Sequence, residues 1–278
     1  MSAPSRRLLP RDAFQDQVAI VTGGGTGIGK VIARTLALAG ARVVIASRKK
    51  DVLDEAVAGF GAEGLTARAI PADVRDPAQV DALVQGTLDA FGRLDVLVNN
   101  AAGNFVVASE ELSPNGFRTV VDIVLNGTFL CTRAAARHWL DKGLPGSVVN
   151  LIATYAWTGA PGVVHSAAAK AGVWNMTMTL AAEWGSRKIR VNAVAPGIVV
   201  TEGASKNLGY EDPAVQQALT SLIPARRLAT PEEVADAVAY LASPFASYVT
   251  GTCLTIDGGM WLGRGLSGMM EDVSVRMK

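Results

Sequence analysis

The sequence predicts one α/β domain, built as a doubly wound (Rossmann) parallel sheet with helices on both of its faces. Short apolar runs rich in Val and Ile alternate with longer segments of helical periodicity, which is typical of repeated βαβ units. The runs are continuously apolar rather than alternating, as expected of strands that are covered on both faces. Because no repeat, linker or shift of composition appears before about Gly197, we treat residues 1–278 as a single dinucleotide-binding domain.

The elements follow one another in a regular order. The candidate strands are Gln17–Thr22, Arg42–Ser47, Thr66–Ile70, Leu94–Asn99, Ser147–Ile152, Arg190–Ala195 and Thr252–Ile256. Helices are predicted over Lys30–Leu38, Ser166–Trp184 and Pro231–Ala242. Two stretches depart from this rhythm: residues 198–230, which we interpret as a substrate-binding flap, and 259–278, a Gly- and Met-rich C-terminal extension to which the sequence assigns no role.

The helix Ser166–Trp184 is apolar on nearly all sides, since its only charged residues are Lys170 and Glu183. Such a helix needs two apolar partners. One is the sheet, and the other is either a second subunit or the later loops of the same chain.

Composition excludes several classes of protein. Hydrophobic residues make up 49% of the chain and 26 Lys+Arg nearly balance 25 Asp+Glu, so the protein lacks the broad positive field that non-specific nucleic-acid binding needs. The two cysteines and two histidines fit neither a disulfide framework nor a metal site. No apolar stretch approaches the length that spans a bilayer. We therefore expect a cytoplasmic protein with reduced thiols and no metal, nucleic-acid or membrane partner.

A glycine-rich turn connects the first strand to the first helix. It reads TGGGTGIG from Thr22 to Gly29, and its glycines allow the backbone to approach a pyrophosphate at the N-terminus of the helix. The alternative is a merely flexible turn, but the position between strand and helix favours a dinucleotide site. The residues expected to hold the phosphates are Gly23, Gly24, Gly25, Thr26, Gly27 and Ile28.

The end of the second strand indicates which dinucleotide binds. NAD-binding chains usually place a carboxylate there for the ribose 2′-hydroxyl, but this chain continues from Ser47 into Arg48, Lys49 and Lys50. Three cations at the start of a helix oppose its dipole unless an anion lies among them. A 2′-phosphate is such an anion, so we predict NADPH as the cofactor and Arg48 as its phosphate ligand. The alternative is a solvated basic turn.

These motifs resemble the short-chain dehydrogenase/reductase family over nearly the whole chain. The matching segments are TGGGTGIG, Asp73-Val74, NNAAG at Asn99–Gly103, Asn126, Lys170 and APG at Ala195–Gly197. The resemblance implies a seven-stranded fold, a homotetramer and a Ser-Tyr-Lys-Asn catalytic set. The chain departs from that set, because Ser166 stands at the tyrosine position four residues before Lys170 and Ala153 stands at the serine position.

The same departure is found in the 2,4-dienoyl-CoA reductase branch of the family, which this chain resembles. The shared strings are IASRK, DVRDP, NNAAGNF, LSPN, DIVLNGT and SAAAK, together with Tyr155. By this resemblance Tyr155 and Asn104 donate to the thioester oxygen of the substrate, Lys170 holds the nicotinamide ribose, and Asn126 supports Lys170. Ser166 takes the vacated tyrosine position.

The resemblance also implies binding roles. Asp73 would lie near the adenine, and Pro196, Gly197, Ile198 and Val199 would line the nicotinamide. Arg75, Phe105 and Ser113 would contact the acyl-CoA substrate, and Arg48 would contact the 2′-phosphate.

The chemistry explains why the hydrogen-bond donor should move. Hydride addition at C5 of a dienoyl thioester sends negative charge along the conjugated chain to the thioester oxygen, so the stabilising donors belong there. Three functions remain open: this reduction as a step of unsaturated fatty-acid β-oxidation, reduction of a 2-enoyl thioester or a carbonyl, and a non-catalytic NADPH-binding scaffold. A structural role for Tyr155 is the alternative to its catalytic one. We interpret His165 as structural, and Trp157 as the tryptophan that borders an acyl chain.

Overall fold

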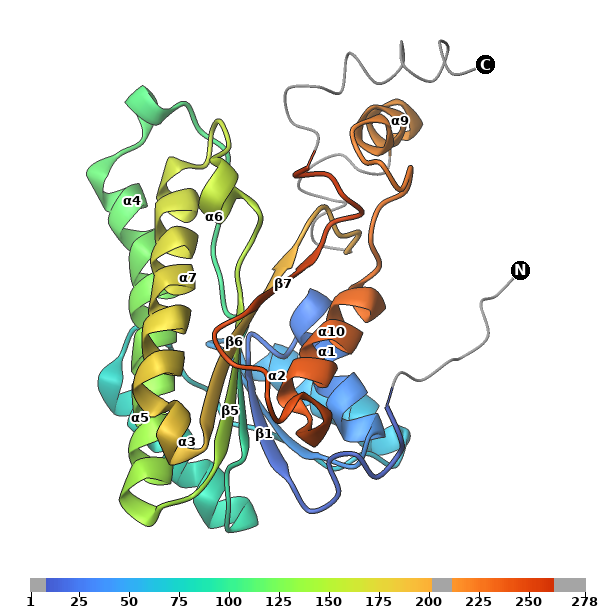
Figure 1. The fold of residues 1–278 in the computed structure, drawn as a ribbon. Helices are drawn as coiled ribbons and strands as arrows, with labels where there is room; N and C mark the ends of the chain where they lie inside the picture. Colours follow the sequence, from blue (N-terminus) through green and yellow to red (C-terminus); the bar gives the residue numbers. More distant parts are fainter. Residues whose placement is uncertain (1–8, 202–211, 263–278) are drawn as a thin grey trace.

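The computed structural model describes residues 9–201 and 212–262. Seven strands form one all-parallel sheet in the order β3-β2-β1-β4-β5-β6-β7 (Figure 1). The strands are β1 Val18–Thr22, β2 Arg42–Ala46, β3 Ala67–Ala69, β4 Val96–Asn99, β5 Gly146–Leu151, β6 Ile189–Pro196 and β7 Cys253–Ile256. Each lies within a predicted run or overlaps it closely, so the predicted fold class is confirmed.

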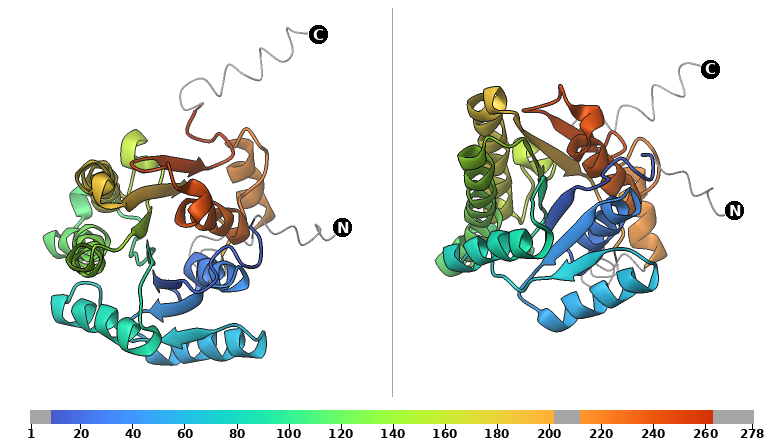
Figure 2. Two further views of the ribbon diagram at one scale, coloured as in Figure 1. Left: turned by 60° about the horizontal axis from the view of Figure 1, so that its bottom comes forward. Right: turned by 90° about the horizontal axis from the view of Figure 1, so that it is seen from below.

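Helices cover both faces of the sheet, as the two views of Figure 2 show. The longer helices are α1 Gly27–Leu38, α2 Lys50–Ala62, α3 Pro77–Phe91, α4 Pro114–Val121, α5 Gly127–Lys142, α7 Val164–Trp184, α9 Pro213–Ser221 and α10 Pro231–Ala242. The shorter ones are η1 Ser109–Glu111, a single π-helical turn η2 Asp122–Asn126, α6 Tyr155–Thr158, η3 Gly185–Arg187 and η4 Pro244–Ala246. Helices α1, α2 and α10 pack on one face, and α3, α5 and the end of α7 pack on the other.

The strands are apolar throughout because each face of the sheet belongs to a different part of the core. In β1, Ala19 and Val21 point into the cluster beneath α1 and α10, whereas Ile20 points into the cluster beneath α3 and α5. Val43 and Val44 of β2 divide in the same way. Successive side chains of a strand point to opposite faces, so a strand buried on both sides needs apolar residues at every position.

Local signals explain where individual helices begin. Helix α10 starts with a capping box in which Thr230 Oγ1 accepts from the Glu233 backbone N–H and the Glu233 side chain accepts from the Thr230 N–H. Pro231 occupies the first turn, and α10 has the bounds predicted for it. Helix α7, by contrast, begins two residues before its predicted start, and its Val164 and Met178 side chains are exposed.

The predicted flap and extension are only partly described. Residues 202–211 of the flap and 263–278 of the extension lie outside the described residues, and the remainder of the flap contains α9. None of the helices in the described ranges combines the length and the apolar character that crossing a membrane requires.

Candidate active site

A cavity of ≈ 610 Å³ opens at the carboxyl ends of β1, β2 and β4. Strand order reverses between β1 and β4, and such a switch point is where open α/β sheets bind their ligands. The residues that line the cavity are Gly23, Gly25, Thr26, Gly27, Ile28, Gly29, Ala46, Ser47, Arg48, Lys49, Val52, Ala72, Asp73, Val74, Asn100, Ala101, Ala102, Ile123 and Thr201. Most of the residues predicted to hold the cofactor therefore meet in one cavity.

The glycine-rich turn leaves no room for a side chain at Gly24 or Gly29. A Cβ at Gly29 would lie 2.3 Å from the carbonyl oxygen of Gly23, and one at Gly24 would lie 2.6 Å from Ile45 Cγ2. Gly27 has a φ of 52°, a left-handed conformation that glycine adopts without strain. The Thr26 side chain does not cap α1, so the first N–H groups of that helix face the cavity as donors for an anion. This cradle fits the pyrophosphate of a dinucleotide.

The basic turn after β2 divides into two parts. Arg48 and Lys49 line the cavity, and Lys49 is the residue that precedes α2. Lys50 instead pairs with Asp54 at 2.5 Å, one helical turn away on the exposed surface. The two cations that face the cavity fit a further phosphate at its rim.

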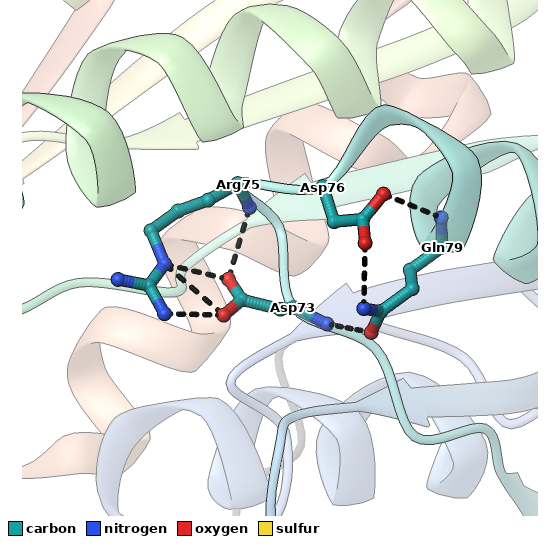
Figure 3. Close-up of polar contacts among 4 residues, drawn as sticks. All are labelled: Asp73, Arg75, Asp76 and Gln79. Atoms are coloured by element: carbon teal, nitrogen blue, oxygen red, sulfur yellow. Dashed lines mark hydrogen bonds and ion pairs between the residues drawn. The ribbon is translucent and has the colours of Figure 1, made fainter.

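Asp73 is held by Arg75 at the edge of the same cavity (Figure 3). The guanidinium Nε lies 2.9 Å from Asp73 Oδ1, Nη2 lies 2.5 Å from Oδ2, and the Arg75 backbone N–H donates to Oδ1 at 3.0 Å. These hydrogen bonds lower the pKa of Asp73, and the charge of Arg48 lowers it further, while partial burial acts in the opposite direction. The structure thus joins a residue expected near the adenine to one expected near the substrate.

Gln79 also holds the loop 73–76, on the side opposite Arg75. This residue was not predicted from the sequence. Its Oε1 accepts the Asp73 backbone N–H at 2.9 Å, and its Nε2 donates to Asp76 Oδ2 at 2.8 Å (Figure 3). Asp76 in turn caps α3 by accepting from the Ala78 N–H. The Asp-Pro pair at the start of α3, with Gln three residues after the Asp, is the signal that could have indicated this arrangement.

The catalytic residues predicted on α6 and α7 meet beyond the end of β5. Tyr155 begins α6, and its hydroxyl lies 3.0 Å from the Oγ of Ser166 near the start of α7. Burial raises the pKa of Tyr155, and the hydrogen bond with Ser166 partly opposes that effect. The phenol is therefore neutral at neutral pH and can donate a hydrogen bond.

Lys170 lies one turn further along α7 and is almost completely buried. Its Nζ donates to the backbone carbonyl of Leu151, the last residue of β5. Burial lowers the pKa of Lys170 to about 8, so the ammonium is held where it costs free energy. Ionisable groups in such positions cluster at functional sites.

The loop after β4 carries the other predicted donor. Asn104 is exposed, and its Oδ1 accepts the Phe105 backbone N–H at 3.0 Å. In the described residues no hydrogen bond uses its amide NH₂, which can therefore donate to a ligand. The Phe105 ring packs edge-on against His165, with ring centroids 4.5 Å apart. His165 is fully buried beside Ser166, so this contact brings the Asn104 loop to the start of α7.

Two predicted residues have structural partners of their own. Ser113 caps α4, since its Oγ accepts from the Gly116 N–H at 3.0 Å. Asn126 is exposed at the end of the π-helical turn, and its Nδ2 donates to Asp122 Oδ1 at 2.7 Å. In the described residues no hydrogen bond joins Asn126 to Lys170. The residue of this turn that is buried in the cluster with α7 is Val124.

The segment predicted to line the nicotinamide leaves the carboxyl end of β6. The Gly197 N–H donates to Ile256 of β7 at 2.9 Å, and a Cβ on Gly197 would lie 2.7 Å from Asp257 Cβ. The Ile198 carbonyl accepts from Ala229 at 3.1 Å. Thr201, just beyond this segment, lines the cofactor cavity and was not predicted to do so.

Comparison with known proteins agrees with this geometry. Residues 23–261 match the family model described as Enoyl-(Acyl carrier protein) reductase. The chain is 46% identical over 251 residues to a probable 2,4-dienoyl-CoA reductase of Bacillus subtilis, with 90% of this chain and 98% of that protein covered. It is 41% identical to a peroxisomal 2,4-dienoyl-CoA reductase of Arabidopsis thaliana, with 91% and 87% covered.

Solved structures show the same likeness. A crystal structure of a short chain dehydrogenase from Bacillus anthracis superposes with a TM-score of 0.78 at 44% identity and covers 88% of this chain and 96% of its own. A putative short-chain alcohol dehydrogenase from Sinorhizobium meliloti gives a TM-score of 0.85 at 36% identity, with 91% and 99% covered.

The chain therefore belongs to the short-chain dehydrogenase/reductase family and is an oxidoreductase that uses a nicotinamide cofactor. Within this family it falls in the branch of the 2,4-dienoyl-CoA reductases, which confirms the resemblance found in the sequence. In the described residues no group of three or more His, Cys, Asp or Glu side chains could hold a metal ion.

Proposed function

We propose that the protein is an NADPH-dependent 2,4-dienoyl-CoA reductase. The observation that carries this proposal is the contact between the Tyr155 hydroxyl and Ser166 Oγ. Ser166 stands where the family resemblance places a catalytic tyrosine, and Tyr155 brings a phenol next to that serine from a different helix. This arrangement favours an active reductase over a scaffold that has simply lost its catalytic tyrosine.

The proposed mechanism uses the cofactor as a hydride donor and the protein as a binding site for negative charge. NADPH, when bound, supplies a hydride to C5 of the dienoyl thioester. Tyr155 and the amide NH₂ of Asn104 would donate hydrogen bonds to the thioester oxygen, where the charge of the dienolate gathers. The Lys170 ammonium, one helical turn from Ser166 on α7, would add a positive charge at this end of the helix and help to orient the nicotinamide ribose.

We propose that the dienolate then takes its proton at C2, which gives a 3-enoyl product. C2 is bonded to the carbonyl carbon whose oxygen Tyr155 would bind, so a proton delivered near that oxygen would have a shorter path to C2 than to C4. The relatives are named for different products. The name of the Bacillus subtilis protein specifies a (2E)-enoyl product, and the name of the Arabidopsis thaliana protein specifies a (3E)-enoyl product. Reduction in deuterated water decides it, because deuterium at C2 of a 3-enoyl product is expected and deuterium at C4 contradicts the proposal.

The choice of NADPH is supported by the cations at the cavity rim. Arg48 and Lys49 line the cavity where an NAD-binding chain places a carboxylate, and Arg48 is close enough to Asp73 to lower the pKa of that carboxyl. A 2′-phosphate between these groups would compensate the excess positive charge.

The remaining parts of the proposal concern assembly and pathway. A homotetramer is supported by exposed apolar side chains on α4, α5 and α7, namely Phe117, Phe129 and Met178. Cys131 and Cys253 are free thiols, which fits the cytoplasmic location predicted from the sequence. A reduction of dienoyl-CoA would serve the β-oxidation of unsaturated fatty acids.

A second candidate is reduction of a 2-enoyl thioester, because the matching family model carries that description. Purified protein is assayed with NADPH and, in separate reactions, hexa-2,4-dienoyl-CoA, a 2-enoyl-CoA, a 2-enoyl thioester of acyl carrier protein and a simple ketone. Fastest oxidation of NADPH with the dienoyl-CoA is expected. Preference for a 2-enoyl thioester supports the second candidate, and binding of NADPH without turnover of any substrate supports a scaffold.

A further inference from the structure

Two tryptophans from distant parts of the chain meet near the catalytic tyrosine. Trp157 lies on α6, two residues after Tyr155, and Trp261 lies in the segment that follows β7. Their rings pack edge to face, with centroids 5.7 Å apart and an interplanar angle of 85°. This is a favourable geometry for aromatic pairs, and it links α6 to the segment 257–262.

Strand order shows where this link lies. Helix α6 follows β5 and the Trp261 segment follows β7, while β6 lies between these two strands in the parallel sheet. Figure 1 shows α6 and the segment after β7 at the same end of the sheet. The tryptophan pair therefore spans the carboxyl end of β6, where the chain continues into Pro196–Val199, the segment expected beside the nicotinamide.

A buried carboxylate fixes the position of Trp261. Asp257 is 7% exposed, and its two oxygens accept the backbone N–H groups of Gly259 at 2.9 Å and Trp261 at 2.8 Å. Gly258 and Gly259 have φ values of 62° and 86°, which the tight turn requires. The turn packs directly on Gly197, since a Cβ there would collide with Asp257.

The pair does not serve to fill the core. In the described part of the chain, neither Trp157 nor Trp261 belongs to any of the three hydrophobic clusters or packs against them. Trp157 keeps 36% of its surface exposed. Two large aromatic rings that hold each other outside the core, beside a catalytic residue, are placed to contact a ligand.

We propose that Trp157 and Trp261 form the end wall of the acyl-chain cleft and set the longest acyl chain that the enzyme accepts. This inference rests on the proposed function. With the thioester oxygen on Tyr155 and C5 at the nicotinamide, the alkyl chain beyond C5 points at the tryptophan pair above Pro196–Val199. Because the rings touch each other, they bridge the space between α6 and the segment 257–262.

The test compares substrates of two chain lengths. The ratio of kcat/KM for deca-2,4-dienoyl-CoA to that for hexa-2,4-dienoyl-CoA is measured in the wild type and in Trp261→Ala, Trp261→Phe and Trp157→Phe. The control variant is Phe245→Ala, which removes an exposed aromatic ring on η4, at the amino-terminal edge of the sheet. Thermal unfolding followed by circular dichroism verifies the folding of each variant, and Trp261→Phe keeps the test possible if Trp261→Ala does not fold.

In Trp261→Ala this ratio should rise at least tenfold, with hexadienoyl-CoA turnover within about threefold of wild type, since one methylene group against an apolar wall changes discrimination by about 10-fold or more. The phenylalanine variants should show smaller rises, and the control none. An unchanged ratio would mean that the pair only fastens the segment 257–262, and a lower ratio would mean that the rings attract long chains. Either result overturns the proposal.

A binding measurement separates this inference from the proposed function. If the wild type reduces no dienoyl-CoA, the proposed function is wrong, and isothermal titration with hexanoyl-CoA and decanoyl-CoA then tests the wall alone. Trp261→Ala should improve the affinity for decanoyl-CoA relative to hexanoyl-CoA about tenfold. Equal changes in affinity for both chain lengths, or no binding of either acyl-CoA, would reject the proposal that the tryptophan pair forms the end wall of the acyl-chain cleft.

Discussion

The hydroxyl of Tyr155 lies 3.0 Å from that of Ser166, although the two residues are separated by 11 positions in the chain and stand on different helices. Ser166 and Lys170 are four residues apart on α7 and so share one face of that helix. The phenol, the serine hydroxyl and the buried ammonium are consequently neighbours at one end of α7. Removing one of the two hydroxyl groups should therefore change the hydrogen bonding and the orientation of the other.

Replacing Tyr155 by phenylalanine should lower kcat for dienoyl-CoA reduction by about 10²-fold, since one donor to the developing oxyanion is lost. The variant keeps the ring and removes only the hydroxyl. Fluorescence titration should give an unchanged Kd for NADPH, because the phenol does not line the cofactor cavity. Turnover equal to that of wild type would remove Tyr155 from the mechanism.

Replacing Ser166 by alanine should have a milder effect, of about tenfold on kcat, because Tyr155 retains its hydroxyl and loses only the group that orients it. In the double variant with Tyr155→Phe the losses should not add, since the serine acts through the phenol. A kinetic double-mutant cycle measures this coupling. Fully additive losses would show that the two hydroxyls act independently.

The fold could be predicted from local patterns. Continuously apolar runs indicate strands that are buried on both faces, and Ile20 and Val21 indeed point into opposite halves of the core. The glycine-rich turn could also be interpreted, because its function depends on neighbours in sequence. The tight fit around Gly24 and Gly29 is the physical reason for that motif.

The arrangement of the site could be predicted less well, because it depends on contacts between distant segments. No periodicity indicates that Phe105 packs against His165, or that Trp157 packs against Trp261. The single π-helical turn before α5 shifts which residues face α7, so that Val124 is buried there and Asn126 is exposed. A sequence pattern with regular helical spacing does not reveal such a shift.

Arg48→Ala should weaken NADPH binding by about 10²-fold and NADH binding by less than about threefold, since only NADPH carries the 2′-phosphate that the guanidinium would bind. Dissociation constants for both cofactors decide this. Lys50→Ala is the matched control, because Lys50 is paired with Asp54 on the surface and should change neither constant. Equal losses for the two cofactors in Arg48→Ala would contradict the assignment of the 2′-phosphate.

The two residues that hold Asp73 should have separable effects. Gln79→Leu removes the acceptor for the Asp73 N–H and should raise the Kd for NADPH about fivefold, which corresponds to the loss of one hydrogen bond.

Arg75→Met should raise KM for acyl-CoA while changing the Kd for NADPH by less than about threefold, because Gln79 still holds the backbone of Asp73. If Arg75→Met affected NADPH alone, the expected contact of Arg75 with the substrate would be wrong.

Lys170→Met should stabilise the cofactor-free protein at pH 7 while abolishing most of its activity. Burial lowers the pKa of Lys170 to about 8 from its ordinary value of 10.5, so below pH 8 the lysine is charged in both folded and unfolded chains and its burial opposes folding. Between pH 8 and pH 10.5 the unfolded chain binds more protons than the folded chain. The free energy of unfolding of the wild type therefore rises with pH in this range.

The variant, which has no ammonium to bury, should accordingly be more stable than the wild type by roughly 2 kcal/mol at pH 7, after allowance for the Leu151 carbonyl that loses its donor. This advantage should shrink as the pH rises from about 8 and vanish before pH 10.5, because the hydrogen bond lost at Leu151 still counts against the variant when the lysine is neutral. Urea unfolding at a series of pH values measures the difference, with Lys142→Met, which replaces an exposed lysine on α5, as the control for removing a lysine that is not buried. A stability difference that stays constant from pH 7 to pH 10 would show that the Lys170 ammonium is not destabilised by burial, and its positive charge would then be as available at high pH as at low.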